Sequence, residues 1–196
     1  SAKGEENTED ASKSQFVGAF AVVVANHTNV AQITAGAEAE GAVSVEAIAK
    51  VKYTTTADGS AIIATEEGET VKTSVGVAVV VQVIDADNLA EVSGGSIEAE
   101  SLSVSATSGE EENAAGSSAV ANAGFSAGDF GLGGAIAVNV YNAETKAHVD
   151  SIQLNVTGDI TISAVDHSDT VTTGDAAGTV TENPDGSTST VLQQGS

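Results

Sequence analysis

Apolar and polar residues alternate with a period of two along most of the chain, which is the pattern of β-strands with one buried face. Three stretches share one strongly apolar face, made by Phe20, Val22, Val24; Val79, Val81, Val83; and Ile136, Val138, Val140. We expect this face to point into the core, so that a charge placed at Val81 would be costly. The opposite face begins with Ala19, Ala78 and Ala135, and these small residues predict a returning segment packed closely against it.

Two further strands are predicted in each stretch. A short one carries inward Ala31 and Ile33, with equivalents Ala90, Val92 and Ala147, Val149. A third carries inward residues in three aligned sets: Val43, Val45, Ala47; Leu102, Val104, Ala106; and Ile160, Ile162, Ala164. Polar residues at 26–29, 85–88 and 142–145 predict turns between the first two strands. A helix is conceivable only near 110–123, and Asn183-Pro184-Asp185-Gly186 predicts a hairpin.

These strands belong to a repeat that occurs three times. Val17–Ile33, Gly76–Val92 and Gly133–Val149 align without a gap, so the repeat is 57–59 residues long. We divide the chain into repeat units 17–75, 76–132 and 133–196, with 1–16 as the tail of a preceding repeat because Ser1-Ala2 resembles Ser105-Ala106. Repeats of this kind stack into solenoids. The sequence therefore predicts one all-β, right-handed parallel β-helix segment over 1–196, and a coil of about 20–25 residues would give at least two coils per repeat.

Charge narrows the possible partners. The chain has 28 acidic residues against 6 basic ones, all lysine, and a formal net charge of −22. Such a surface repels nucleic acid and anionic membranes, and no apolar run approaches the roughly 20 residues of a membrane helix. The absence of Cys excludes disulfides and thiolate chemistry. We therefore expect no nucleic-acid binding and no membrane insertion.

A family resemblance follows from the repeat itself. Gly133–Val149, followed by Gly158-Asp159-Ile160-Thr161-Ile162-Ser163-Ala164, resembles the repeats of giant bacterial surface adhesins, namely leukotoxin-type filamentous adhesins and other β-strand-repeat proteins. The first copy departs from the pattern at Asn26-His27 and lacks the Gly-Asp pair before its third strand. The resemblance implies a long, right-handed parallel β-helix on the cell surface or in an extracellular fibre.

Few residues suggest chemistry. Asp85, Asp87 and Asn88 could offer oxygen ligands to calcium, although a plain solvated turn is the favoured interpretation, because the other two repeats lack these acids. Glutamate runs at 5–6, 66–67 and 110–112 are typical of solvated loops. His27, His148 and His167 have no ligand spacing, and His148 is predicted to point outward. We assign no catalytic, cofactor-binding or metal residue, leaving calcium at Asp85, Asp87 and Asn88 as the open alternative.

We therefore expect a structural and adhesive segment without enzyme activity, acting as a stiff spacer or filament body of a secreted, biofilm-type surface protein. Its partners would be copies of itself or neighbouring repeats, stacked end to end near Phe20–Val24, with a host or glycan receptor undefined. The alternative is a carbohydrate-active β-helix, either a polysaccharide lyase or a glycan-binding module. That alternative is weakened by the absence of arginine and by the scarcity of aromatic residues such as Tyr53 and Tyr141.

Overall fold

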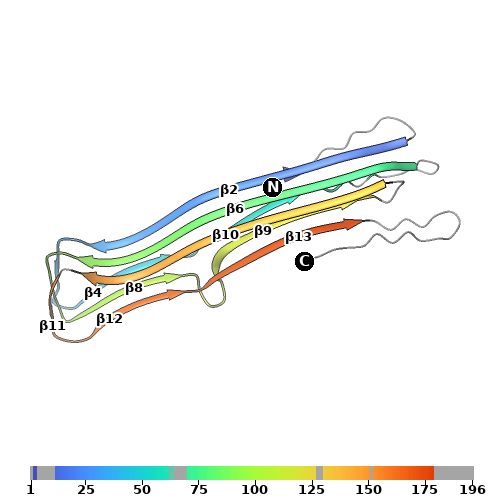
Figure 1. The fold of residues 1–196 in the computed structure, drawn as a ribbon. Helices are drawn as coiled ribbons and strands as arrows, with labels where there is room; N and C mark the ends of the chain where they lie inside the picture. The colour runs from blue at the N-terminus through green and yellow to red at the C-terminus, as the bar shows by residue number, and fades with distance from the viewer. Residues whose placement is uncertain are drawn as a thin grey trace.

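The chain forms a parallel β-solenoid of three coils (Figure 1). The computed structural model describes residues 2–3, 12–61, 63, 70–126, 130–150 and 152–178. Each coil contributes one strand to each of four sheets, and every strand pair is parallel. The predicted all-β parallel solenoid of three repeats is confirmed.

The four sheets have different lengths. The longest contains β2 (Ser12–Ile33), β6 (Thr70–Ser93) and β10 (Phe130–Asp150). A short sheet at the bend contains β3 (Ala37–Glu38), β7 (Ser96–Ala99) and β11 (Gln153–Val156). The chain returns through β4 (Ala42–Ala49), β8 (Ser101–Ser108) and β12 (Ile160–Asp166). The last sheet contains β1 (Ala2–Lys3), β5 (Lys52–Asp58), β9 (Ala115–Phe125) and β13 (Ser168–Gly178).

One repeat makes one coil. The expectation of at least two coils per repeat is wrong, because it assumed short strands, whereas β2, β6 and β10 are 22, 24 and 21 residues long. The turns predicted at 26–29, 85–88 and 142–145 are absent, and these residues lie inside the long strands. Residues 115–123 of the conceivable helix form most of β9. The predicted hairpin at 183–186 lies outside the described residues.

The register agrees with the sequence repeat over its whole length. Val22 pairs with Val81 and Val81 with Val138, and Val45, Val104 and Ile162 likewise form one column. The β1 strand differs from expectation, since Ala2 pairs with Ala57 in the last sheet and not in the column of Ala106. Equivalent residues of successive coils therefore stack directly, as in-register parallel pairing requires.

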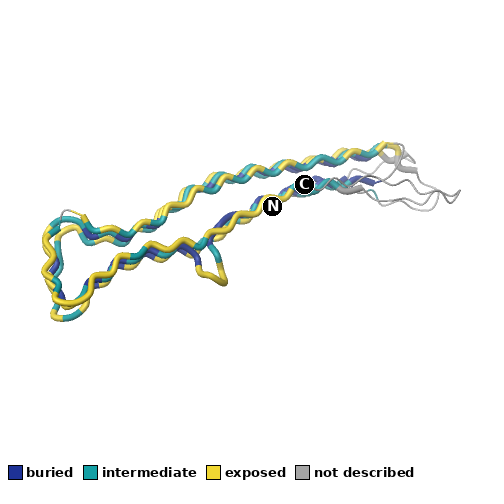
Figure 2. The backbone as a smooth tube through the Cα atoms, turned by 60° about the horizontal axis from the view of Figure 1, so that its bottom comes forward, coloured by how far each residue is buried: buried dark blue, intermediate teal, exposed yellow. Residues whose placement is uncertain are grey.

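The coil has two parts of different width, which Figure 2 shows in cross-section. The head, at the bend, encloses aliphatic residues: Val43, Val45, Val92, Ile97, Leu102 and Val104. In the narrow section the first half of each long strand faces the returning β5, β9 or β13 across small residues: Ala19, Ala57, Ala78, Ala119, Ala121 and Ala123. The predicted close packing on the alanine face is thus confirmed.

Backbone contacts set the thickness of the narrow section. A Cβ atom at Gly59 would lie 1.9 Å from the carbonyl oxygen of Val77, and one at Gly76 would lie 2.3 Å from that of Gly124. Both distances are far below van der Waals contact, so these positions accept only glycine without movement of the backbone. At these two positions the layers therefore approach too closely to hold a side chain between them.

The face assignment of the first strand is wrong. Val22 and Val138 are 50% and 43% exposed, and Val81 is partly exposed, whereas Val80 is fully buried. Alternation continues without interruption from Gln15 to Ile33, so the inward phase of Ala31 and Ile33 extends back to the alanines. Most bulky residues of the narrow section consequently lie on its outer face, and its interior holds mainly alanine together with Val80.

Most of the inward positions predicted for the second and third strands of the first two repeats are confirmed. Val45 and Val104 are buried, and the pairs Ala31, Ile33 and Ala90, Val92 belong to the head core or pack against it. Ile162 occupies the same column as Val104 but is exposed, because it belongs to the last coil. The prediction of its column is correct, and that of its burial is not.

The adjacent valines of β6 provide a direct test of this corrected phase. We expect Val80→Asp to lower the free energy of unfolding by about 3 kcal/mol or more, since it buries an unpaired charge among alanines. Val81→Asp, on the outward face, should lower it by about 1 kcal/mol or less. Urea unfolding followed by circular dichroism measures both variants. Equal losses would contradict the assignment of faces.

Candidate functional site

Asn88 belongs to the interior and not to a surface turn. Its Nδ2 donates hydrogen bonds to the carbonyl oxygens of Thr107 and Ala47, at 2.9 and 3.2 Å. Its Oδ1 accepts a hydrogen bond of 2.8 Å from Nδ2 of Asn29 in the preceding coil. These contacts join the long sheet to the ends of β4 and β8, and they saturate the polar atoms of a buried side chain.

Asp85 and Asp87 point to the opposite side of β6. The Asp85 side chain accepts a hydrogen bond of 2.8 Å from Nδ2 of Asn142 in the next coil, and Asp87 is exposed. Because Asn88 faces inward, the three residues considered for calcium do not share a face. No group of three or more His, Cys, Asp or Glu side chains in the described part of the chain is arranged to hold a metal ion.

A second polar row crosses the narrow section. Gln82 is fully buried, and its Oε1 accepts a hydrogen bond from the Thr55 hydroxyl on the returning strand. In the last coil, Asn139 accepts a hydrogen bond of 2.7 Å from the Ser117 hydroxyl, and its Nδ2 donates to the carbonyl oxygen of Val171 at 3.1 Å. These side chains join the two layers and have a structural role.

The titratable side chains are dispersed. His148 points outward as predicted, with its Nε2 3.5 Å from Oε1 of Glu91. Partial burial raises the pKa of the Tyr141 phenol above its ordinary value, a hydrogen bond with Ser168 opposes this rise, and Asp166 adds to it. The phenol is therefore neutral at physiological pH. Glu110 pairs with Lys50 at the surface, whereas the glutamate runs at 5–6 and 66–67 lie outside the described residues.

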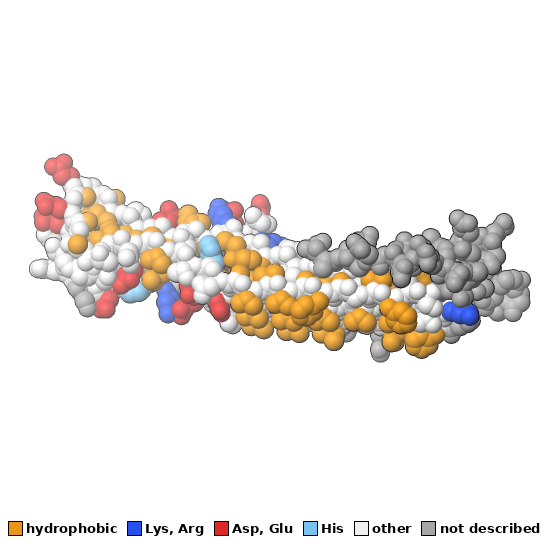
Figure 3. Space-filling model, turned by 90° about the horizontal axis from the view of Figure 1, so that it is seen from above, with side chains coloured by type: hydrophobic (Ala, Val, Ile, Leu, Met, Phe, Trp, Pro, Cys, Tyr) orange, Lys and Arg blue, Asp and Glu red, His pale blue; other side chains and the backbone are white. Residues whose placement is uncertain are grey.

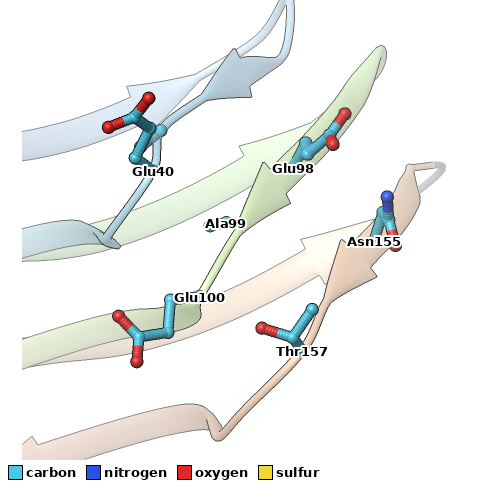
Figure 4. A pocket seen from close by; sticks show the side chains of 7 residues that line it. Glu40, Glu98, Ala99, Glu100, Asn155 and Thr157 are labelled. Carbon is cyan, nitrogen blue, oxygen red and sulfur yellow. The ribbon is translucent and has the colours of Figure 1, made fainter.

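An open surface hollow of about 360 Å³ lies on the head and was not predicted (Figure 4). Its acidic residues are Glu40, Glu98 and Glu100, and Asn155 and Thr157 line the last coil's side of it. The Glu98 and Glu100 carboxylates point in different directions in Figure 4. The lining contains no basic or aromatic residue. The basic and aromatic residues whose scarcity in the sequence weakens the carbohydrate-active alternative are therefore missing from this lining as well.

The sequence contains a signal for this hollow. Glu38-Ala39-Glu40 and Glu98-Ala99-Glu100 repeat one Glu-Ala-Glu phrase in consecutive coils, with the alanine turned inward. Parallel in-register stacking places such phrases side by side. Like charges stacked in this way repel each other, and exposure to water screens the repulsion.

The last coil exposes apolar side chains at its end of the solenoid. Ile97, Leu102 and Val104 of the middle coil are 0%, 1% and 0% exposed. Their partners in the last coil, Leu154, Ile160 and Ile162, are 38%, 48% and 50% exposed. The head core is therefore open at this end, and a further coil in the same register would cover it.

The column of inward-facing side chains that contains Asn29 and Asn88 also ends without an asparagine in the last coil. Thr145 occupies the column of Asn29 and Asn88, and its Oγ1 is buried without a hydrogen-bond partner. A threonine hydroxyl is too short to reproduce the contacts that the Asn88 amide makes across the interior.

No family model, no curated protein and no solved structure matches this chain. Among the described residues, no helix has the length and apolarity needed to span a membrane. The geometry of the coils is therefore the main guide to the function of the chain.

The buried asparagine gives the second prediction. We expect Asn88→Ala to lower the free energy of unfolding by about 2–3 kcal/mol, because two buried carbonyl groups and Asn29 lose their partner. Asn142→Ala is the matched control, since Asn142 is exposed and bonds only across the surface to Asp85. It should change stability by no more than about 0.5 kcal/mol. A similar loss in both variants, measured by urea unfolding, would contradict an interior role for Asn88.

Proposed function

We propose that this chain is a structural segment of a bacterial surface protein or extracellular fibre, in which coils stack end to end into a stiff filament body. The proposal combines the adhesin-like repeat with the geometry of the coils. An adhesive role, and a location outside the cell, follow from the resemblance and are part of the same proposal.

The exposed head core of the last coil is the observation that carries the proposal. Leu154, Ile160 and Ile162 continue columns that are completely covered one coil earlier. Fully burying a large aliphatic side chain contributes roughly 1.5–3 kcal/mol, and covering these three half-exposed side chains would contribute about half of that each. A stacked coil would therefore gain several such contributions from this end.

Backbone pairing favours the same arrangement. Within the described residues, no strand pairs with the outer edge of β2 or of β10, although each is more than 20 residues long. Open strand edges template the addition of further strands. Contact between the two different ends is heterologous, and it extends into a filament when it does not close.

The dimensions suggest a ribbon more than a thin stalk. Each added coil lengthens the solenoid by about 4.8 Å, the spacing of neighbouring strands. A 22-residue strand such as β2 measures about 70 Å across the solenoid axis. A filament built in this way has a width set by the long strand and a length set by the number of coils.

The third prediction tests end-to-end stacking. Electron microscopy of the concentrated protein should show ribbons about 70 Å wide, and sedimentation velocity should show mass that increases with concentration. Ile162→Asp should abolish this growth by placing a charge on the open end. Val171→Asp is the control, because Val171 is also exposed on the last coil but lies on the outward face of β13.

Two results would contradict the proposal. One is a wild-type protein that forms no species longer than a few coils at any concentration tested. The other is an Ile162→Asp variant that forms ribbons as readily as Val171→Asp. Circular dichroism of each variant establishes that the coil itself has remained folded.

A further inference from the structure

The outward face of the long sheet carries a block of apolar residues that the solenoid itself leaves uncovered. We define the apolar block as the outward positions within residues 16–24 of β2, 75–83 of β6 and 132–140 of β10. Every one of these positions is Phe, Val, Leu, Ile or Gly. Figure 3 shows hydrophobic side chains in a band along the narrow section, with acidic side chains gathered toward the head.

The size of the apolar block exceeds what isolated proteins expose. Phe16, Phe20 and Val24 are 71%, 64% and 76% exposed. With neighbours of similar size, the apolar block presents on the order of 1,000 Å² of side-chain surface, since a large side chain has roughly 150–250 Å². The largest apolar patch of a typical monomer is about 300–600 Å², and a stable interface buries about 800 Å² per partner.

The fold does not require this composition. The opposite outer face of the same narrow section, on β5 and β9, carries Thr54, Asp58 and Asn122 at outward positions. Both outer faces cover the same thin alanine interior. A polar outer face is therefore compatible with this architecture. The apolar block on the other side instead indicates a surface that is covered by a binding partner.

We propose that the occupant is a second copy of this chain, and that two solenoids pair face to face through their apolar blocks. This pairing is independent of end-to-end stacking, which uses the strand edges and the last coil. In a stacked array it would join two ribbons along their whole length.

Charge favours this site of contact. Two chains of net charge −22 repel each other over most of their surfaces. The apolar block contains no charged residue, and the acidic side chains of β6 begin only at Asp85, beyond its end. Contact through the apolar block keeps the acidic heads in water and brings together the neutral faces.

The surface of the apolar block has both protruding and recessed positions, which a second copy of the chain could fit. A Cβ atom added at Gly18 or at Gly134 would have no heavy atom within 4 Å, so these two positions are depressions in the surface. Exposed Phe16 and Phe20 flank Gly18, and exposed Leu132 and Ile136 flank Gly134. In an isologous dimer the same face meets itself across a two-fold axis, so in the proposed pair protrusions of one copy would enter depressions of the other.

The test compares two valines of β2 that point in the same direction. Val22 lies within the apolar block and is 50% exposed, whereas Val30 lies outside it and is 46% exposed. In sedimentation velocity, the wild type and Val30→Lys should form a dimer of twice 19.3 kDa. Val22→Lys should raise the dissociation constant at least about tenfold, because it desolvates a charge. All three proteins also carry Ile162→Asp, which removes end-to-end stacking. The result therefore reports face-to-face pairing alone, whether or not the proposed stacking occurs in the unmodified chain.

Gly18→Val separates specific pairing from general stickiness. This variant adds apolar surface and meets nothing in its own chain, so a general hydrophobic attraction would become stronger. Self-complementary pairing should instead become at least about tenfold weaker, since the added side chain fills a depression that the partner needs. Circular dichroism should be unchanged.

Cross-linking locates the contact. The chain has no cysteine, so Val81→Cys at the centre of the apolar block and Leu89→Cys beyond it each introduce one unique thiol. Oxidation should yield a covalent dimer from Val81→Cys in large excess over Leu89→Cys. A monomeric wild type, equal dissociation constants for Val22→Lys and Val30→Lys, tighter pairing of Gly18→Val, or flotation of monomers with phosphatidylcholine vesicles would overturn the proposal.

Discussion

The close approach of two sheets in the narrow section is the constraint on which the rest of the structure depends. Gly59 and Gly76 meet opposing carbonyl groups at distances that exclude any side chain, and mostly alanine side chains fill the remaining space. Because so thin an interior has room mainly for alanine, with Val80 and Gln82 among the few larger side chains inside it, most bulky residues in the first half of the long strands lie on its outer face. The larger aliphatic core lies in the head, where the short strands at the bend hold the layers apart.

Much of the fold can be predicted from the sequence. The main error, the assignment of inward and outward faces in the long strand, has one cause. Gap-free repetition and period-two alternation predicted the parallel solenoid and the columns of Val45 and Val104. The polar residues near Asn88 are typical of a turn, and a turn there would allow the two halves of the long strand to have opposite phases. An unbroken strand permits only one phase, and the pairs Ala31, Ile33 and Ala90, Val92 already indicated which.

The candidate functional features also divide into those that the local sequence indicates and those that need the assembled coil. Local composition favoured Asp85, Asp87 and Asn88, but the strand turns Asn88 inward, where its amide joins β6 to β4 and β8. The hollow beside Glu98 needed the stacking register as well as the local sequence. The open end and the apolar block depend on which residues lack a neighbour, and that property emerges only from the assembled coil. Buried amides such as Asn88 and Gln82 also fix the register, because a slipped coil would leave them without partners.

The orientation of the backbone hydrogen bonds has a mechanical consequence. Strands run across the solenoid axis, so the hydrogen bonds between coils lie along it. A pull along the axis loads the whole perimeter of a coil at once, and the bonds of all four sheets share the force. A pull at one edge of the ribbon instead opens the bonds in succession, starting at the end of a long strand. The same molecule should therefore resist axial tension and yield to peeling.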